Sequence, residues 1–123
     1  MLPLCFVPAC SVVPNPQHLS VNEAITSSAE LDGSTISVSG YLIAAFEDHN
    51  LYATRRDARD KIRTDSHCLA LEFTQEQFEK WQSHDAAKVV ITGRLNADFC
   101  GTDVYCPSSC NQIGLQDITI VSD

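Results

Sequence analysis

The protein has 123 residues, of which 44% are hydrophobic and 20% are charged, and its formal net charge is −8. This length fits one domain with its own core, and apolar residues in strand-sized runs exclude a disordered chain. Sixteen acidic residues against eight basic ones disfavour a polyanionic partner such as nucleic acid. No apolar run reaches the ~20 residues of a membrane-spanning helix.

The first half of the chain predicts one short helix followed by two strands. Ser20 and Glu23 have the Ser-x-x-Glu spacing of a capping box, which places the start of a helix at Ser20. From Thr35 onward, apolar and small polar residues alternate in the pattern of a half-buried strand. The predicted elements are, in chain order, a helix over 20–29, a turn over 31–34, a strand over 35–46, a turn over 47–50 and a second strand that begins at 51.

The second half predicts a polar loop, three strands and another helix. Thr74 and Gln77 also have the spacing of a capping box, and Phe78 and Trp81 give the helix that follows an apolar i, i+3 edge. The predicted elements are, in chain order, a long loop with room for one helical turn over 55–65, a strand over 67–73, a helix that begins at 74, a strand over 88–99 and a strand over 117–121.

This order of three strands, a helix and two strands is that of an OB-fold, a five-stranded Greek-key barrel. The sequence therefore predicts a mainly β chain with a short N-terminal helix. The later helix lies between strands three and four and closes the barrel with Phe78 and Trp81. Gly40 and Gly93 have matching neighbours inside strands, which indicates two sharply bent strands. A different small β-barrel and a half-open sheet are the alternatives.

Six cysteines are many for a cytosolic domain of this size. Three of them share a loop that also contains Gly, Pro and Ser, as a disulfide-stapled loop would. The fourth lies in the strand over 67–73, on the face turned away from the main core. We predict disulfides among Cys68, Cys100, Cys106 and Cys110, in one of three pairings that the sequence does not distinguish. A zinc site, for which no C-x-x-C pair is present, and free thiols are the alternatives.

The N-terminal segment has some features of an export signal. We assign residues 1–19 to an apolar N-terminal segment, interpreted as the remnant of a signal or lipoprotein leader, and residues 20–123 to a single domain. Val7-Pro8-Ala9-Cys10 resembles the end of a bacterial lipoprotein signal, which makes Cys10 the candidate lipidation site. The alternatives are a flexible tail and a true start upstream of Met1.

Four short pieces of the chain carry a family resemblance. They are Asp32-Gly33, Val38-Ser39-Gly40-Tyr41-Leu42, Asn50-Leu51-Tyr52-Ala53-Thr54-Arg55-Arg56-Asp57-Ala58 and Val90-Ile91-Thr92-Gly93-Arg94. With these pieces the chain from Leu31 to Val121, about three quarters of its length, resembles a group of small, poorly characterised bacterial OB-fold-like proteins. Such proteins are often exported or lipid-anchored. The resemblance implies the fold and a location in the periplasm or cell envelope, with the cytoplasm as the alternative, and it implies no activity.

The motifs of common enzymes are missing from the sequence. It contains no phosphate-binding glycine loop, no G-x-S-x-G and no H-E-x-x-H. The four histidines have no metal-ligand spacing; they are His18, His49, His67 and His84. We therefore predict no catalytic residue, no metal site and no cofactor, and a protein that is not an enzyme.

The basic residues are unevenly placed, because five of the eight lie between Arg55 and Arg63. In an OB-fold the second and third strands and the adjacent loops form the usual ligand face. The predicted ligand-binding residues are Tyr52, Arg55, Arg56, Arg59 and Arg94. The alternative is a solvated loop whose arginines pair with nearby aspartates.

Together these patterns predict a non-enzymatic binding module of the bacterial cell envelope. Its ligand is expected to be a protein or an anionic envelope component, and it is expected to contact a membrane only through a lipid anchor at Cys10. One alternative is a small acidic inhibitor, of the immunity-protein type, that neutralises a basic partner. Another is binding of single-stranded nucleic acid, which rests on fold analogy alone and is disfavoured by the acidic charge.

Overall fold

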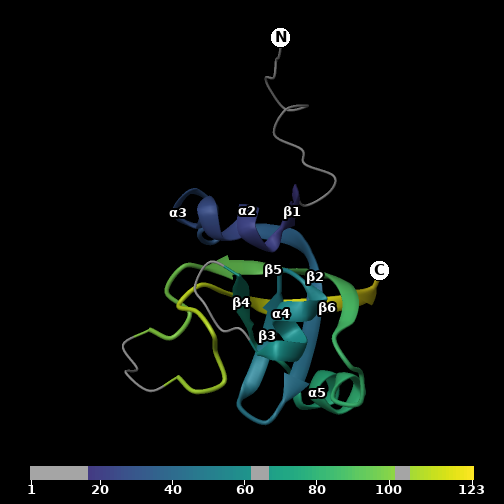
Figure 1. Cartoon of the computed structure of the whole chain (residues 1–123). Coiled ribbons are helices and arrows are strands. Elements are labelled where there is room, and N and C mark those ends of the chain that lie inside the picture. Colours follow the sequence, from purple (N-terminus) through teal and green to yellow (C-terminus); the bar gives the residue numbers. More distant parts are fainter. Residues whose placement is uncertain (1–16, 62–66, 102–105) are drawn as a thin grey trace.

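The computed structural model describes residues 17–61, 67–101 and 106–123 (Figure 1). The elements are β1 (Gln17–Ser20), α2 (Val21–Thr26), α3 (Ser28–Leu31), β2 (Thr35–Ala45), β3 (Asp48–Tyr52), α4 (Arg55–Asp60), β4 (Cys68–Leu71), α5 (Gln75–Trp81), β5 (Ala87–Asn96) and β6 (Gly114–Ser122). In this part of the chain no helix is long and apolar enough to cross a membrane.

Six strands form one mixed sheet in the order β1-β2-β3-β4-β6-β5. An additional pairing between β2 and β5 joins five of them, β2 to β6, into a ring. β4 and β6 are parallel, and the other neighbours in the ring are antiparallel. The prediction of a mainly β chain with a helix between its third and fourth ring strands is confirmed. The sixth strand, β1, was not predicted; it lies parallel to β2.

Two glycines allow the long strands of the ring to curve. A Cβ atom added at Gly40 on β2 would lie 2.7 Å from Leu51 Cγ and 2.8 Å from the carbonyl oxygen of Tyr52. At Gly93 on β5 it would lie 2.8 Å from Ile118 Cγ2, where the pairing with β6 also shifts register. The absence of a side chain therefore lets neighbouring strands approach closely at both positions.

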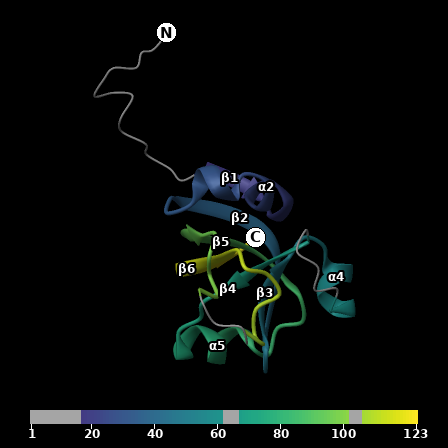
Figure 2. The ribbon, with the colours of Figure 1, turned by 90° about the vertical axis from the view of Figure 1, so that its left-hand side faces the viewer.

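Short helices lie near opposite ends of the ring, α2 and α3 near one end and α5 near the other (Figure 1), and Figure 2 shows the same separation of α2 and α5. Both predicted capping boxes are present, because Ser20 accepts the backbone N–H of Glu23 and Thr74 accepts that of Gln77. Trp81 of α5 is buried in the main core, and Phe78 of the same helix is partly buried and packs against it.

A second, smaller cluster of buried residues lies outside this core. It consists of Ile43, Tyr52, Ala58, Cys68, Ala86 and Cys110. Cys68 therefore faces away from the main core, as predicted from its place in the strand alternation. Because Ala58 belongs to α4 and Cys110 to the loop before β6, these two segments cover the face of β2, β3 and β4 that carries the second cluster.

The segments before and after β3 differ from the prediction. The turn expected over 47–50 is shorter, since β2 ends at Ala45 and β3 already begins at Asp48. Residues 55–60, expected within a long loop with room for one helical turn, form α4, because the Thr54 side chain accepts the backbone N–H of Asp57 and caps the helix. The polar residues at 48–50 and 55–60 suggested a turn and a loop. The structure depends instead on buried hydrogen-bond partners for β3 and on the Thr54 cap for α4.

Candidate functional site

Three of the four cations predicted to bind a ligand come together on one side of the ring. Arg55, Arg56 and Arg59 lie on α4, and Lys61 is the residue that ends this helix, with a left-handed backbone conformation (φ 56°). All four side chains are exposed. We call these four residues the α4 cationic surface.

Arg55 is held against the sheet by two contacts. Its guanidinium carbon lies 4.8 Å from the ring centroid of Tyr41 on β2, which is a cation–π geometry. Its Nε donates a hydrogen bond of 3.4 Å to the carbonyl oxygen of Ala86. Since neither partner is an acid, the positive charge of Arg55 is not neutralised by these contacts.

Arg56 and Arg59 have acidic neighbours. The Arg56 Nε lies 3.5 Å from the Asp60 carboxylate one turn along α4, and the Arg59 guanidinium lies 3.3 Å from the carboxylate of Asp85. All four side chains are well exposed, and ion pairs of this kind contribute little free energy and are screened by salt. The alternative of local Arg–Asp pairing is thus seen for these two arginines.

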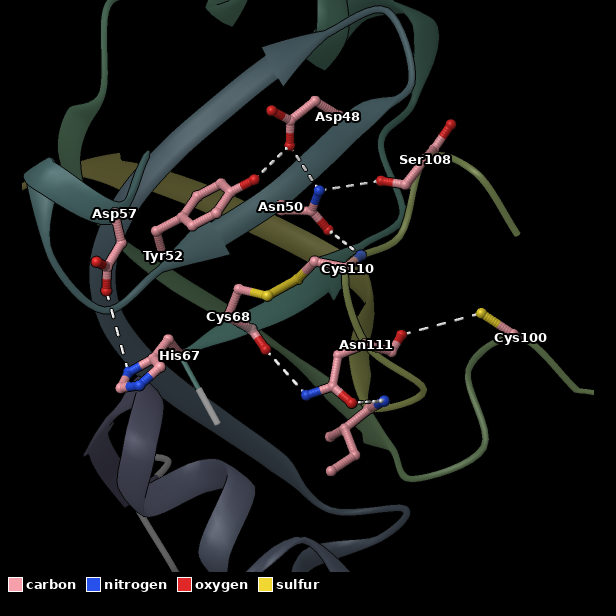
Figure 3. Close-up of a disulfide and its surroundings, with 11 residues drawn as sticks. Asp48, Asn50, Tyr52, Asp57, His67, Cys68, Cys100, Ser108, Cys110 and Asn111 are labelled. Carbon is pink, nitrogen blue, oxygen red and sulfur yellow. Dashed lines mark hydrogen bonds and ion pairs between the residues drawn. A yellow bond between two sulfur atoms is a disulfide. The ribbon is translucent and has the colours of Figure 1, made fainter. Parts of the chain in front are cut away.

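Lys61 connects the α4 cationic surface to a buried polar network, of which Figure 3 shows Asp48, Asn50 and Tyr52. Its ammonium group lies 3.4 Å from Asp48 Oδ2, and the Asp48 side chain is almost fully buried. The other oxygen, Oδ1, accepts hydrogen bonds from the Asn50 side-chain amide at 2.6 Å and from the Tyr52 hydroxyl at 2.9 Å. Burial of this carboxylate is therefore matched by two neutral donors and one cation.

Tyr52 is the predicted binding residue that the structure does not place at the surface. Its side chain is 0% exposed, its ring belongs to the second buried cluster and its hydroxyl donates to Asp48. The strand alternation does put Tyr52 on the outer face of the sheet, but α4 and the loop around Cys110 cover that face. Tyr52 packs in one buried cluster with Ala58 of α4 and cannot stack on a ligand in this structure.

Arg94 also lies apart from the other predicted residues. It is on β5 opposite Thr35, six residues along β2 from Tyr41, a distance of about 20 Å along the strand. The Arg94 guanidinium is hydrogen-bonded to the carboxylate of Asp117 and donates to Gln116 at 3.1 Å. It therefore belongs to the β5–β6 pairing and not to the α4 cationic surface.

The four predicted disulfide cysteines form two bonds, Cys68–Cys110 and Cys100–Cys106, with Cα–Cα distances of 6.3 and 6.1 Å. Within the described ranges no cysteine is free. The zinc and free-thiol alternatives are incompatible with these bonds, since zinc needs thiolates. The candidate lipidation site, Cys10, lies outside the described residues.

The loop before β6 lies against the edge of β3 and β4. The backbone N–H of His49 donates to the Ser108 carbonyl at 2.9 Å, and the Asn50 amide donates to the same oxygen at 3.1 Å. The Asn111 amide donates to the carbonyl of Cys68 at 3.0 Å. Together with the Cys68–Cys110 disulfide, these bonds hold the loop beside β3 and β4.

Asp85, the acidic partner of Arg59, was not predicted as part of a site. It lies 26 residues after Arg59 in the sequence, so no local pattern marks it. Residues 17–61, 67–101 and 106–123 contain no cluster of three or more residues suited to hold a metal ion. Comparison of the chain with protein-family models, curated proteins and solved structures finds no significant match.

Proposed function

We propose that the protein is a non-enzymatic binding module of the bacterial cell envelope and that its α4 cationic surface binds an anionic envelope component. The observation that carries this proposal is the concentration of charge. Four of the eight basic residues of an acidic chain lie within residues 55–61, on one short helix and its end. With Asp57 and Asp60 this segment has a formal net charge of +2 in a protein of net charge −8, and it attracts anionic groups that the rest of the molecule repels.

The strand order supports an OB-fold-like Greek-key barrel as the scaffold of this module. The ring strands follow one another as β2, β3, β4, β6 and β5, and α5 lies between β4 and β5 in sequence. Five strands with this helix position agree with the OB-fold pattern. In this proposal the covered β3–β4 face supports α4. The ligand contacts the exposed side of α4 instead of the β3–β4 face.

The two disulfides fit an oxidising, extracytoplasmic setting. The more specific proposal, a location in the periplasm or cell envelope, rests in addition on the resemblance to exported bacterial proteins. A lipid anchor at Cys10 would then hold the domain near phosphate-bearing lipids, to which a surface with arginines is suited because guanidinium groups bind phosphate oxygens in pairs.

The experiment is a vesicle-binding measurement with two charge-matched variants. Arg56→Glu combined with Arg59→Glu alters the α4 cationic surface, and Lys80→Glu combined with Lys88→Glu alters the same number of cations elsewhere. Each pair of substitutions changes the formal net charge by four, from −8 to −12. We expect the wild type and the lysine variant to sediment with phosphatidylglycerol vesicles and the arginine variant to remain in solution. Equal loss of binding in both variants, or retention in both, would contradict the proposal.

A second function, inhibition of a basic partner, is favoured by the charge of the remaining chain. Outside residues 55–65 there are three basic and thirteen acidic residues, a net charge of −10. Such a surface speeds association with a cationic protein. The same variants separate the two functions. Under the inhibitor hypothesis, the arginine variant would bind immobilised polylysine at least as well as the wild type. Its binding to polylysine would not depend on phosphatidylglycerol.

A further inference from the structure

Three aromatic rings from three different segments meet at the end of the ring that carries α5. The His49 ring of β3 lies 5.1 Å from the Phe73 ring, which follows β4, and 5.4 Å from the Phe78 ring of α5, centroid to centroid. The planes are tilted by 54° and 51°, so neither phenyl ring stacks flat on the imidazole. With Thr74 and Gln75 these rings line an open hollow of about 200 Å³.

The rings are fixed in place by the fold. Phe73 and Phe78 are partly buried and pack against the main core, and the His49 backbone is hydrogen-bonded to Ser108. Thr74 and Gln77 form the capping box that begins α5 directly beside the hollow. Because the rings are held by the core, a ligand would meet preformed faces and little ordering would be needed on binding.

The chemistry of the hollow favours a cation without N–H groups. Partial burial lowers the pKa of His49 below its ordinary value of 6.5, against an opposing effect of the Asp48 carboxylate, so the imidazole is neutral at pH 7. The Phe73 and Phe78 rings attract a cation through their quadrupoles, and an uncharged imidazole beside them does not repel it. A primary ammonium would lose hydrogen bonds to water here, whereas a quaternary ammonium has none to lose.

The exposed charges close in sequence to the lining residues are mostly negative. Within two residues of a lining residue there are four exposed acids, Glu47, Glu72, Glu76 and Glu79, and one exposed cation, Lys80. No arginine or lysine lines the hollow. A positively charged ligand therefore approaches through a negative local field.

We propose that the hollow between His49, Phe73 and Phe78 binds a quaternary ammonium group, such as the headgroup of a choline compound. This site is distinct in its chemistry from the α4 cationic surface, and Figure 2 shows α4 and α5 on different sides of the ring. Failure of one proposal therefore leaves the other standing.

The test is an NMR titration of the full chain with choline and, separately, with 3,3-dimethylbutan-1-ol. In this alcohol a carbon atom replaces the quaternary nitrogen of choline. We expect saturable shifts of the His49, Phe73 and Phe78 ring signals with choline, and at least about threefold weaker binding of the neutral alcohol, as the loss of cation–π attraction requires. Equal affinity for the two compounds, or choline shifts that do not saturate, would overturn the proposal. This comparison needs no variant.

Two leucine variants localise the site. Phe78→Leu keeps an apolar side chain and removes one ring, and we expect it to weaken choline binding about threefold to thirtyfold. Phe46→Leu is the control, because Phe46 is 87% exposed and does not line the hollow. The NMR spectrum reports directly whether each variant is folded. Equal weakening by both substitutions, or by neither, would refute the assignment to these rings.

Discussion

Asn50 is hydrogen-bonded to the backbone of Cys110, whose sulfur is bonded to Cys68 on the neighbouring strand. The Asn50 Oδ1 atom accepts the Cys110 N–H at 2.9 Å, while the disulfide links Cys110 to β4 (Figure 3). The same loop residue is thus attached to β3 by a hydrogen bond and to β4 by a covalent bond. This double attachment keeps the outer face of the two strands covered and leaves α4 as the exposed charged element on this side.

The first prediction concerns Asn50, which is fully buried. Asn50→Ala would remove the acceptor of the Cys110 N–H and the amide that donates to Asp48 and Ser108. Because a buried polar group without its partner costs about 1–3 kcal/mol, we expect the free energy of unfolding to fall by about 2–3 kcal/mol. Chemical denaturation measures this change. The control is Asn96→Ala, and a loss there as large as that at Asn50 would contradict the special role of the buried network.

The second prediction compares the two disulfides. Cys68 and Cys110 are 42 residues apart in sequence, whereas Cys100 and Cys106 are only six apart. A bond that closes a longer loop restricts the unfolded chain more. We expect replacement of the Cys68–Cys110 pair by alanines to lower the unfolding free energy by about 4 kcal/mol, and replacement of the Cys100–Cys106 pair to lower it by about 2 kcal/mol. The reverse order of stability would show that loop length does not govern these bonds.

Features with a local signature were predictable from the sequence. The alternation in β2, the capping boxes at Ser20 and Thr74 and the apolar edge with Trp81 depend on residues close together in the chain. Such patterns fix the type of an element through side-chain periodicity and terminal hydrogen bonds, whichever partner it packs against.

Features that depend on distant partners were not predictable. Asp48 and Asn50 suggest a turn by residue type, yet both are buried in β3 because Tyr52, Lys61 and Cys110 satisfy their polar atoms. The burial of Tyr52 likewise follows from α4 and from the Cys68–Cys110 bond. Four cysteines allow three pairings. Cys68 pairs with Cys110 because the sheet places β4 beside the loop before β6, and the spacing of the cysteines in the sequence does not predict this arrangement.

The third prediction tests whether α5 plugs the ring. Trp81 is 4% exposed within the main core, whereas Phe46, also a large aromatic residue, is 87% exposed at the β2–β3 turn. Trp81→Ala would leave a cavity that the surrounding strands cannot fill, and we expect it to cost about 3–5 kcal/mol of unfolding free energy. Phe46→Ala is the matched control and should change stability by about 0.5 kcal/mol or less. Thermal and chemical unfolding measure both, and comparable losses would show that α5 does not close the core.

The fourth prediction concerns the pH dependence that His49 gives to stability. Burial lowers the pKa of His49 in the folded protein, and the nearby Asp48 carboxylate, which raises it, does not offset the effect. Below the ordinary value of 6.5 the unfolded chain therefore binds a proton at this histidine that the folded chain does not yet bind. The free energy of unfolding should fall as the pH drops from 6.5 to the folded-state pKa, and the contribution should level off below that pKa.

The measurement is denaturant unfolding of the wild type, His49→Gln and His67→Gln between about pH 8 and pH 5. His49→Gln should lose this part of the decrease on acidification, because glutamine does not titrate. His67→Gln retains His49, so its free energy of unfolding should still show this part of the decrease on acidification. NMR titration of the His49 ring gives the folded-state pKa independently, and a value at or above 6.5 would contradict the prediction, since the linkage would then vanish or change sign.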